Sequence, residues 1–276
     1  MSKIISVAAG AAVAGYLYLI APNPRDDADK RPFRVSYAHR GLHGNGVPEN
    51  SLAAFRRAVD AGVGIELDLQ LSSDGEVMVF HDDTLDRMTG YSASLSSMSA
   101  QTLRALRLQD TEEKIPYFHE VLALVNGRVP LLIELKGRSA TDMRLCEKVS
   151  AMLKNYKGLF CIESFNPMQL RWWKIHRPDV IRGQLVTNLV KKKKGISKDP
   201  VDYLLTPMLT NVLSRPDFVA ADKRMKNLSV YLTTKVMHAD RFEWTVKGDV
   251  DRRIALQKGK YPIFELIIAS AEEKDT

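Results

Sequence analysis

Residues 65–71 have the sequence IELDLQL, in which apolar and polar residues alternate without a break. Alternation with a period of two is typical of a β-strand, and residues two positions apart then lie on the same face. Glu66 and Asp68 therefore project side by side from a strand that is otherwise rich in leucine and isoleucine. Two neighbouring carboxylates are the arrangement that a hard divalent cation requires.

Residues that can carry chemistry are concentrated around this strand, between Tyr37 and Asp82. They occur in four short motifs: His39-Arg40-Gly41, Pro48-Glu49-Asn50, Glu66-Leu67-Asp68 and His81-Asp82. Histidines can transfer protons, carboxylates can hold a cation, and an arginine can bind phosphate. Together these residue types indicate a metal-assisted phosphodiesterase.

The composition is that of an ordinary globular chain. Of its 276 residues, 45% are hydrophobic and 26% are charged, which is enough for one large domain with a sizeable core. The net charge of +7 favours an anionic partner, whether a membrane surface, nucleic acid or a phosphorylated substrate. Cys146 and Cys161 show no CxxC spacing, which argues against a disulfide framework and against a zinc–thiolate site.

The N-terminal segment differs in character from the rest of the chain. Residues 4–21 are uncharged and apolar, and at about 18 residues they are just long enough to span a bilayer. This predicts a single N-terminal transmembrane helix, a membrane anchor over residues 1–22. A cleaved secretory signal is the alternative, because Lys3 provides a positive start, but no small-x-small cleavage site follows the apolar run.

Basic residues flank the predicted anchor unequally. Lys3 precedes it, whereas Arg25, Lys30, Arg31 and Arg34 follow it. The positive-inside rule then predicts a single-pass membrane protein whose large domain is cytoplasmic, with an extracytoplasmic domain as the alternative.

After a polar linker at residues 23–33, short β-branched or apolar runs alternate with amphipathic helical stretches. Strands are expected at residues 35–38, 65–71, 77–81, 131–136, 159–164, 181–186, 203–205 and 218–220, with later candidates at 230–233, 242–246 and 263–265. These exceed eight, so some of them must be additions to the sheet or errors. The alternation is typical of α/β units and favours a closed (β/α)8 barrel, with a doubly wound open sheet as second choice. The domain is expected over residues 34–270, followed by a polar tail at 271–276.

A second acidic strand supports a cation site. In the run LLIELK at residues 131–136, Glu134 and Lys136 are two positions apart and share one face. Taken alone, this pair is equally compatible with a solvent-exposed ion pair. Beside Glu66 and Asp68 it completes an oxygen-rich ligand set, which suits Mg²⁺ or Ca²⁺ better than zinc.

In this order and spacing, the motifs resemble those of the glycerophosphodiester phosphodiesterase family, whose fold is a TIM barrel. The resemblance covers most of residues 35–268 and includes the HRG, PEN-S, E-x-D, HD and E-x-K elements. Softer matches follow at Ile115-Pro116, Ser164-Phe165-Asn166-Pro167, Arg215-Pro216-Asp217-Phe218 and Trp244-Thr245-Val246. Residues from 84 to about 114 resemble the small insertion that such enzymes carry.

The resemblance implies metal-dependent hydrolysis of glycerophosphodiesters to glycerol 3-phosphate and an alcohol. It implies that His39 and His81 are the general base and the general acid. Glu66, Asp68 and Glu134 would hold one cation, Mg²⁺ or Ca²⁺, and Arg40 and Lys136 would bind the phosphate. Attack would come from the glycerol 2-hydroxyl of the substrate.

Three further residues have two interpretations each. Glu49 either supports the cation and Arg40 or is an acidic residue at a helix N-terminus. Trp244 either forms a wall for the glycerol or belongs to the barrel core, and Phe165 presents the same choice.

Two departures from the family pattern bear on substrate choice: Lys247, where asparagine is frequent, and the run Lys191 to Lys194. The lysine run is either a solvated loop or a contact with anionic lipid. With the predicted anchor, it makes a lysophospholipase D-type activity at the membrane the first alternative. A catalytically silent lipid-binding barrel is a second alternative, and the absence of a recognisable nucleic-acid-binding motif argues against a nucleic-acid partner.

Overall fold

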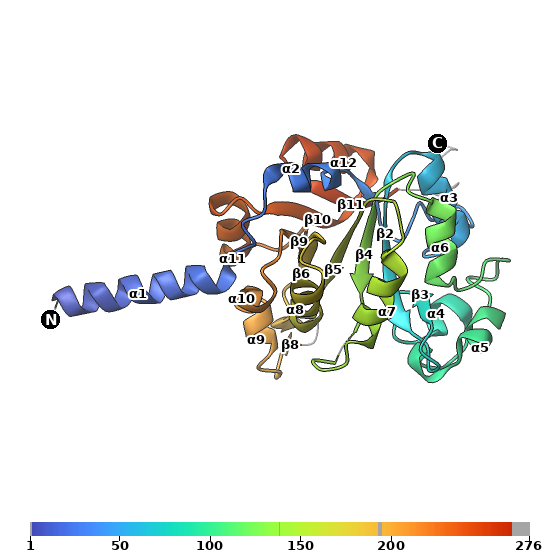
Figure 1. The fold of residues 1–276 in the computed structure, drawn as a ribbon, viewed down its shortest axis with the longest axis horizontal. Coiled ribbons are helices and arrows are strands. Elements are labelled where there is room, and N and C mark those ends of the chain that lie inside the picture. Colours follow the sequence, from blue (N-terminus) through green and yellow to red (C-terminus); the bar gives the residue numbers. More distant parts are fainter. Residues whose placement is uncertain (1, 138, 193–194, 267–276) are drawn as a thin grey trace, which may run out of the picture.

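The computed structural model describes residues 2–137, 139–192 and 195–266, and a closed barrel of parallel strands lies at its centre (Figure 1). Among these residues the barrel strands are, in spatial order, β1 (Tyr37–Ala38), β2 (Gly64–Leu71), β4 (Leu131–Leu135), β5 (Phe160–Ser164), β6 (Arg182–Val186), β9 (Phe218–Asp222), β10 (Asp240–Lys247) and β11 (Tyr261–Glu265). The barrel closes because β1 pairs with both β2 and β11. The prediction of a (β/α)8 barrel is confirmed, and the open sheet is excluded.

Three further strands of the described residues lie outside the parallel barrel. β3 (Val77–Val79) pairs antiparallel with β2, and β7 (Lys191–Lys192) pairs antiparallel with β8 (Gly195–Ile196). The expected strand at 77–81 is therefore the return arm of a hairpin and not a barrel strand.

The helices of the described residues surround the barrel or fill its loops. They are α1 (Ser2–Ile20), α2 (Asp27–Lys30), α3 (Leu52–Asp60), α4 (Asp86–Thr89), α5 (Ala100–Ala105), α6 (Phe118–Val125), α7 (Arg144–Leu153), α8 (Pro167–His176), α9 (Asp202–Leu205), α10 (Asn211–Ser214), α11 (Leu228–Tyr231) and α12 (Gly248–Gln257), with short η1 (Arg31–Phe33), η2 (Leu95–Ser97) and η3 (Leu232–Val236). Local sequence explains where several of them begin. The Ser51 hydroxyl accepts a hydrogen bond from the backbone N–H of Ala54 at the start of α3, and the side chain of Asn166 caps α8, whose first residue is a proline.

Alternation along the strands separates two apolar layers. Leu67 and Ile133 point outward and pack under the helices, whereas Leu132 and Phe242 point into the barrel. Carboxylates that share the inward face therefore lie above this inner layer, toward the carboxyl ends of the strands, where barrel active sites are found.

The segment between β3 and β4 has a small apolar core of its own. Its buried side chains include Phe80, Leu85, Met88, Leu95, Leu103 and Ile115. This separate packing holds α4 and α5 beside the barrel mouth.

In the part of the chain that the structure describes, no helix is both long enough and apolar enough to cross a bilayer. The predicted transmembrane anchor over residues 1–22 is therefore wrong, and so is the single-pass membrane location built on it, in either orientation.

The composition and docking of α1 describe this N-terminal helix more closely. From Ala8 to Gly15 the helix consists of small residues except for Val13. Its last turn packs against the domain: Ile20 is fully buried, and its carbonyl accepts hydrogen bonds from Asn211 Nδ2 at 3.1 Å and Thr233 Oγ1 at 3.3 Å. The rest of α1 projects away from the barrel (Figure 1).

Two expected strands are helices. Residues 203–205 belong to α9, and residues 230–233 belong to α11 and η3. The side chain of Asn227 accepts hydrogen bonds from the backbone N–H groups of Ser229 and Val230, and this cap starts a helix before an apolar run that favours a strand by propensity alone.

Two predicted segments lie partly or wholly outside the described residues. One contains Lys193 and Lys194 of the basic run, and the other is the polar tail at 271–276. Contact of the basic run with lipid stays untested.

Candidate active site

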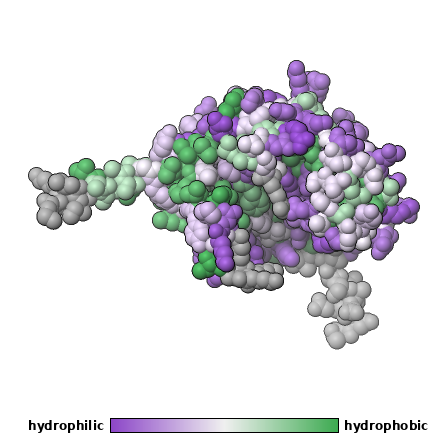
Figure 2. Space-filling view, turned by 90° about the horizontal axis from the view of Figure 1, so that it is seen from below, coloured by the Kyte–Doolittle hydropathy of each residue, from purple (hydrophilic) through white to green (hydrophobic). Residues whose placement is uncertain are grey.

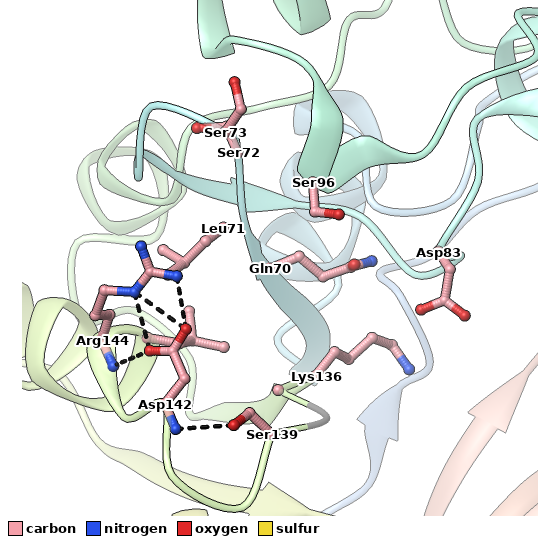
Figure 3. A pocket seen from close by; sticks show the side chains of 12 residues that line it. Gln70, Leu71, Ser72, Ser73, Asp83, Ser96, Lys136, Ser139, Asp142 and Arg144 are labelled. Atoms are coloured by element: carbon pink, nitrogen blue, oxygen red, sulfur yellow. Dashed lines mark hydrogen bonds and ion pairs between the residues drawn. The ribbon is translucent and has the colours of Figure 1, made fainter.

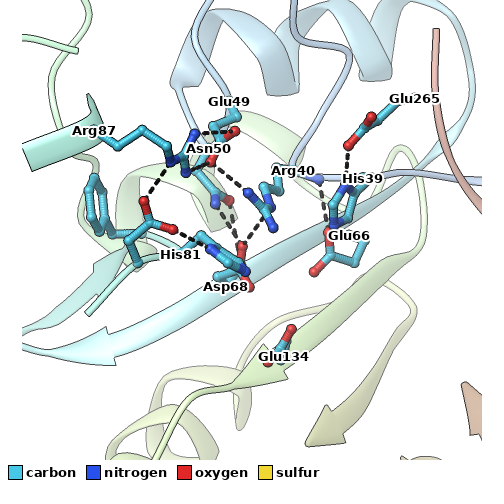
Figure 4. Close-up of polar contacts among 12 residues, drawn as sticks. His39, Arg40, Glu49, Asn50, Glu66, Asp68, His81, Arg87, Glu134 and Glu265 are labelled. Carbon is cyan, nitrogen blue, oxygen red and sulfur yellow. Dashed lines mark hydrogen bonds and ion pairs between the residues drawn. The ribbon is translucent and has the colours of Figure 1, made fainter. Parts of the chain in front are cut away.

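Three carboxylates meet at the mouth of the barrel (Figure 4). Glu66 and Asp68 come from β2 and Glu134 from β4, and one oxygen of each lies within 4.8 Å of the others. Pairing of β2 with β4 sets Asp68 opposite Glu134, which brings the two acidic strands of the sequence into one cluster. All three side chains are almost completely buried.

The cluster is electrostatically strained. Burial, together with repulsion from Asp68 and Glu134, raises the pKa of Glu66 well above its ordinary value. Burial also raises the pKa of Glu134, to about 7, although Lys136 opposes the shift. For Asp68 burial acts in the same direction, but Lys136, His81 and Arg40 outweigh it and hold its pKa below the usual range. Such a cluster is stabilised by a cation.

A fourth carboxylate lies beside the cluster. Glu163 on β5 is opposite Glu134 in the sheet, and burial, with repulsion from Glu66, raises its pKa well above the ordinary value. Its Oε2 is buried and has no hydrogen-bond partner among the described residues. Sequence reasoning missed Glu163, although an isolated acid in the apolar strand FCIES carries the same signal that identified Glu134.

His39 follows β1 and lies on one side of the cluster. Its Nδ1 is 2.8 Å from Glu265 Oε1 at the end of β11. Because a carboxylate only accepts hydrogen bonds, Nδ1 must donate, which leaves Nε2 free to accept a proton. The hydrogen bond from His39 lowers the pKa of Glu265 to about 2, so Glu265 is ionised.

His81 lies on the other side of the cluster. It follows β3, and the antiparallel hairpin brings it back over β2, with the Phe80 N–H bonded to the Asp68 carbonyl at 3.0 Å. Its Nδ1 is 2.6 Å from Asp82 Oδ1. Burial, aided by Lys136 and Arg40, lowers the pKa of His81, although Asp68 and Asp82 act in the opposite direction.

A chain of alternating charges extends from the cluster to His81. Arg40 donates to Glu49 at 2.8 Å, Arg87 of α4 donates to Glu49 and also to Asp82 at 2.6 Å, and Asp82 holds His81. Glu49 therefore orients Arg40, which is one of the two interpretations expected for it. Arg87 lies in the insertion, and its sequence position gave no sign of this role.

The predicted phosphate ligands both border the carboxylates. Arg40 has a left-handed backbone (φ 55°), and its N–H donates to Glu66 Oε2 at 2.8 Å. Lys136 Nζ lies 2.9 Å from Glu134 and 3.2 Å from Asp68. Carboxylates hold the side chains of Arg40 and Lys136 near the cluster. The remaining N–H groups of these two side chains lie at the mouth of the barrel.

These side chains enclose a cavity of about 100 Å³. Its lining includes His39, His81, Glu163, Leu185 and the aromatic pair Phe165 and Trp244. The two rings meet edge to face with centroids 5.8 Å apart, and Trp244 Nε1 donates to the Ala220 carbonyl, so both rings are fixed at the wall of the cavity.

A second pocket, of about 280 Å³, is lined by Lys136 together with mainly polar residues such as Gln70, Ser72 and Asp142 (Figure 3). Among its basic lining residues, Arg144 is paired with Asp142 through two hydrogen-bonding nitrogens, and Lys136 is paired with Glu134, so both charges are already compensated. The predicted catalytic histidines lie in the other cavity.

A larger and mainly apolar groove of about 980 Å³ opens from the catalytic side. It shares His81, Glu134, Lys136 and Phe165 with the small cavity and continues between α8, α9 and α10. Its apolar lining comprises Leu135, Ala140, Phe165, Pro167, Met168, Val201, Leu205 and Leu213. Apolar surface is also more extensive on the side of the domain that bears α1 than on the opposite side (Figure 2).

The structure thus brings together all the residues predicted for the site. His39, Arg40, Glu66, His81, Glu134 and Lys136 line the small cavity with Phe165 and Trp244, Asp68 completes the acidic cluster, and Glu49 supports it from behind. Glu163, Glu265 and Arg87 are the additions that sequence reasoning missed.

Known proteins with similar sequences and folds point in one direction. The family model described as "Glycerophosphoryl diester phosphodiesterase family" matches residues 39–251. A glycerophosphodiester phosphodiesterase of Caldanaerobacter subterraneus subsp. tengcongensis is 33% identical over 229 residues, covering 79% of this chain and 88% of that protein. A rat protein named lysophospholipase D GDPD1 is 30% identical over 168 residues, covering 56% of this chain and 52% of that protein.

The fold is shared with solved structures as well. A phosphodiesterase of Oleispira antarctica, solved in complex with the product sn-glycerol-3-phosphate, superposes with a TM-score of 0.68 at 22% identity, covering 84% of this chain and 92% of that one.

Proposed function

The chain belongs to the glycerophosphoryl diester phosphodiesterase family and is a glycerophosphodiester phosphodiesterase, and from this premise we propose that it works with one divalent cation and two histidines. One observation carries the proposal. His39 and His81 flank a buried cluster of three carboxylates, and each histidine is held through Nδ1 by a carboxylate of its own. Family membership argues against a catalytically silent barrel.

The donor set fits a hard cation. Glu66, Asp68 and Glu134 offer oxygen atoms within 4.8 Å of one another, and all three side chains are almost completely buried. Oxygen ligands favour Mg²⁺ or Ca²⁺ over softer metals. When bound, the cation polarises the phosphoryl oxygens and offsets their charge.

The chain's own residues then account for the proton transfers. His39 Nε2 accepts the proton of the glycerol 2-hydroxyl as that oxygen bonds to phosphorus, and His81 gives its proton to the departing alcohol oxygen. The resulting cyclic phosphate is opened by water to glycerol 3-phosphate, with the two histidines exchanging roles. Arg40 and Lys136 hold the phosphate between them.

The aromatic pair Phe165 and Trp244 orients the substrate. Phe165 and Trp244 form part of the wall of the cavity that the carboxylates also line, and the apolar face of a glycerol carbon chain can pack against them. The product named in the solved relative, sn-glycerol-3-phosphate, is of the size and charge that such a cavity suits. Fixing the glycerol in one orientation brings its 2-hydroxyl close to the phosphorus.

The test is product release by the purified full chain. Glycerophosphocholine, glycerophosphoethanolamine and glycerophosphoglycerol are incubated with Mg²⁺, Ca²⁺ or a chelator, and glycerol 3-phosphate is measured with a coupled enzyme. We expect cation-dependent release that is lost in His39→Ala. Release that persists in chelator, or in a folded His39→Ala protein, would contradict the proposed mechanism.

The pKa of about 7 at Glu134 gives a pH test of the cation site. A cation binds the ionised carboxylates and displaces their protons, so its affinity should rise with pH through the pKa of about 7 at Glu134, and the raised pKa of Glu66 adds to the rise. Each displaced proton contributes up to about tenfold in affinity per pH unit below that point. Isothermal titration with Mg²⁺ or Ca²⁺ on both sides of this pH measures the slope. In Glu134→Gln the affinity should be weaker and the slope smaller, and a flat wild-type profile would contradict the assignment.

The apolar groove favours lysophospholipids as a second substrate class. It opens from His81 and Phe165, is large enough for several methylene groups, and is lined mainly by carbon atoms. Burial of an acyl chain there would add binding energy of about 0.8 kcal/mol per methylene group. The name of the rat relative, lysophospholipase D, supports the same reading.

A matched pair of variants on α9 tests the groove. Leu205 lines it, whereas Leu204 is 49% exposed and does not. We expect Leu205→Glu to lower kcat/KM for lysophosphatidylcholine by about ten- to hundredfold, the value of one buried leucine, and to leave that for glycerophosphocholine unchanged. Leu204→Glu is the control. Equal effects on both substrates would exclude the groove as an acyl site.

A further inference from the structure

A second group of metal-ligating side chains lies next to the catalytic base. One ring nitrogen each from His39 and His43 and one carboxylate oxygen of Glu265 lie within 4.8 Å of one another. The group is separate from the acidic triad: its residues come from the loop after β1 and from the end of β11. The mechanism above uses His39 and Glu265 but gives no role to His43.

The backbone around Gly41 fixes His43 in this place. Gly41 has a φ of 80°, and a Cβ at this position would lie 2.9 Å from Ala54 on α3. The next residue, Leu42, donates its N–H to the Ala54 carbonyl at 3.1 Å, and His43 donates its own N–H to the Gly41 carbonyl at 3.0 Å. The tight turn packs against α3 and returns His43 toward His39.

The ligand chemistry differs from that of the triad. Two imidazoles and one carboxylate suit zinc and similar transition ions, whereas three carboxylates suit Mg²⁺ and Ca²⁺. The side chains of His39 and Glu265 are 14% and 26% exposed, so the group is open to an ion and to a water ligand. His43 Nε2 is buried and has no hydrogen-bond partner within the described ranges, which is unusual for a buried ring nitrogen.

We propose that His39, His43 and Glu265 form a zinc site that switches the enzyme off, distinct from the activating site of the acidic triad. A neutral imidazole carries one lone pair and one N–H. Once Zn²⁺ takes the lone pair of His39, the other ring nitrogen keeps the proton, so the ring can no longer accept one from the substrate. This holds whichever nitrogen binds the ion. Zinc at this site and catalysis by His39 exclude each other.

Zinc binding is measured first, without substrate. The full chain, with Mg²⁺ in excess to occupy the triad, competes with a chromophoric chelator for Zn²⁺. We expect one zinc ion per wild-type chain, and an affinity lower by at least about tenfold in His43→Asn. His176→Asn, which changes an exposed histidine of α8, should bind like the wild type. Equal zinc affinity in the wild type and in His43→Asn overturns the site.

Inhibition is measured second and rests on the proposed function. His43→Asn should turn over glycerophosphocholine at the wild-type rate without zinc, which also establishes that it folds. Wild-type turnover should fall over the same zinc concentrations at which the chelator assay shows binding, and His43→Asn should need at least about tenfold more zinc. Binding through His43 that leaves turnover unchanged overturns the inhibitory role. Failure of the proposed function is distinguishable, because no diester would then be hydrolysed even without zinc, while the binding result is unaffected.

Discussion

Each of the two histidines of the site is held by a carboxylate, but their surroundings differ. His39 Nδ1 meets Glu265 at 2.8 Å, and His81 Nδ1 meets Asp82 at 2.6 Å. Asp82 is itself paired with Arg87, whose other nitrogens hold Glu49. Near Glu265, by contrast, Lys247 Nζ lies 3.9 Å away, at the limit of an ion pair.

This difference suits the base and the acid that we propose for these positions. A base gains a positive charge, and the ionised Glu265 beside His39 compensates that charge. An acid must release a proton, and burial with the nearby cations Lys136 and Arg40 lowers the pKa of His81, which favours release. Two similar dyads are thus suited to opposite tasks by their neighbours.

The strongest test replaces each histidine with alanine in turn and then changes the leaving group of the substrate. His39→Ala and His81→Ala should each lower kcat for glycerophosphocholine by about 10²- to 10⁴-fold. With a glycerophosphodiester of p-nitrophenol, whose leaving oxygen needs no proton, His81→Ala should recover most of the rate of the first step, the release of nitrophenolate, and His39→Ala should not. Release of nitrophenolate is read directly by absorbance. Equal recovery in both variants would mean that the roles are not divided in this way.

The next largest effect is expected when the carboxylate partners are changed. Glu265→Gln and Asp82→Asn preserve size but remove the charge that holds each ring. We expect kcat to fall about ten- to hundredfold with KM nearly unchanged, and more in Glu265→Gln, because a charged histidine forms there during the reaction. Steady-state kinetics on glycerophosphocholine separate the two constants. A rise in KM alone would indicate that Glu265 binds substrate and does not orient His39.

Sequence alone located the acidic cluster but not the carboxylate partner of His39. Glu66, Asp68 and Glu134 stand in strands whose alternation is local, so their common inward face follows from spacing. Glu265 is 226 residues from His39, and their contact depends on barrel closure between β1 and β11. No local pattern encodes that pairing.

The ways in which His81 and Arg87 reach the site could not be predicted from the sequence, for two different reasons. His81 reaches the site because β3 turns back along β2, whereas its sequence is equally compatible with a parallel strand. The contact of Arg87 depends on how the small core of the insertion sets α4 beside the barrel. In α1 the local signal was misleading: no helix of the described residues is long and apolar enough to span a membrane, and the last turn of α1 packs against the domain through Ile20.

A smaller effect should follow when the charge balance around His81 is altered. Arg87→Leu removes a cation from Asp82, so the carboxylate attracts a proton on His81 more strongly and the pKa of His81 should rise. His81 acts while protonated, and activity is lost as pH rises through its pKa, so the alkaline limb of kcat/KM should move to higher pH. Arg87 is 46% exposed, and solvent screening should limit the shift to less than about one pH unit. Arg87→Lys should stay close to wild type, and a limb that moves to lower pH would contradict this account.

The smallest effect is expected at Lys247, the corresponding cation on the His39 side. Its amino group is 3.9 Å from Glu265 and its side chain is 68% exposed, so water screens most of the interaction. Lys247→Met should change kcat by no more than about twofold at physiological salt. Assays at low and high ionic strength check this, because a screened pair should matter slightly more at low salt. A loss comparable to that of Glu265→Gln would mean that Lys247 controls the charge of Glu265, and the two histidine sites would then be more alike than their distances indicate.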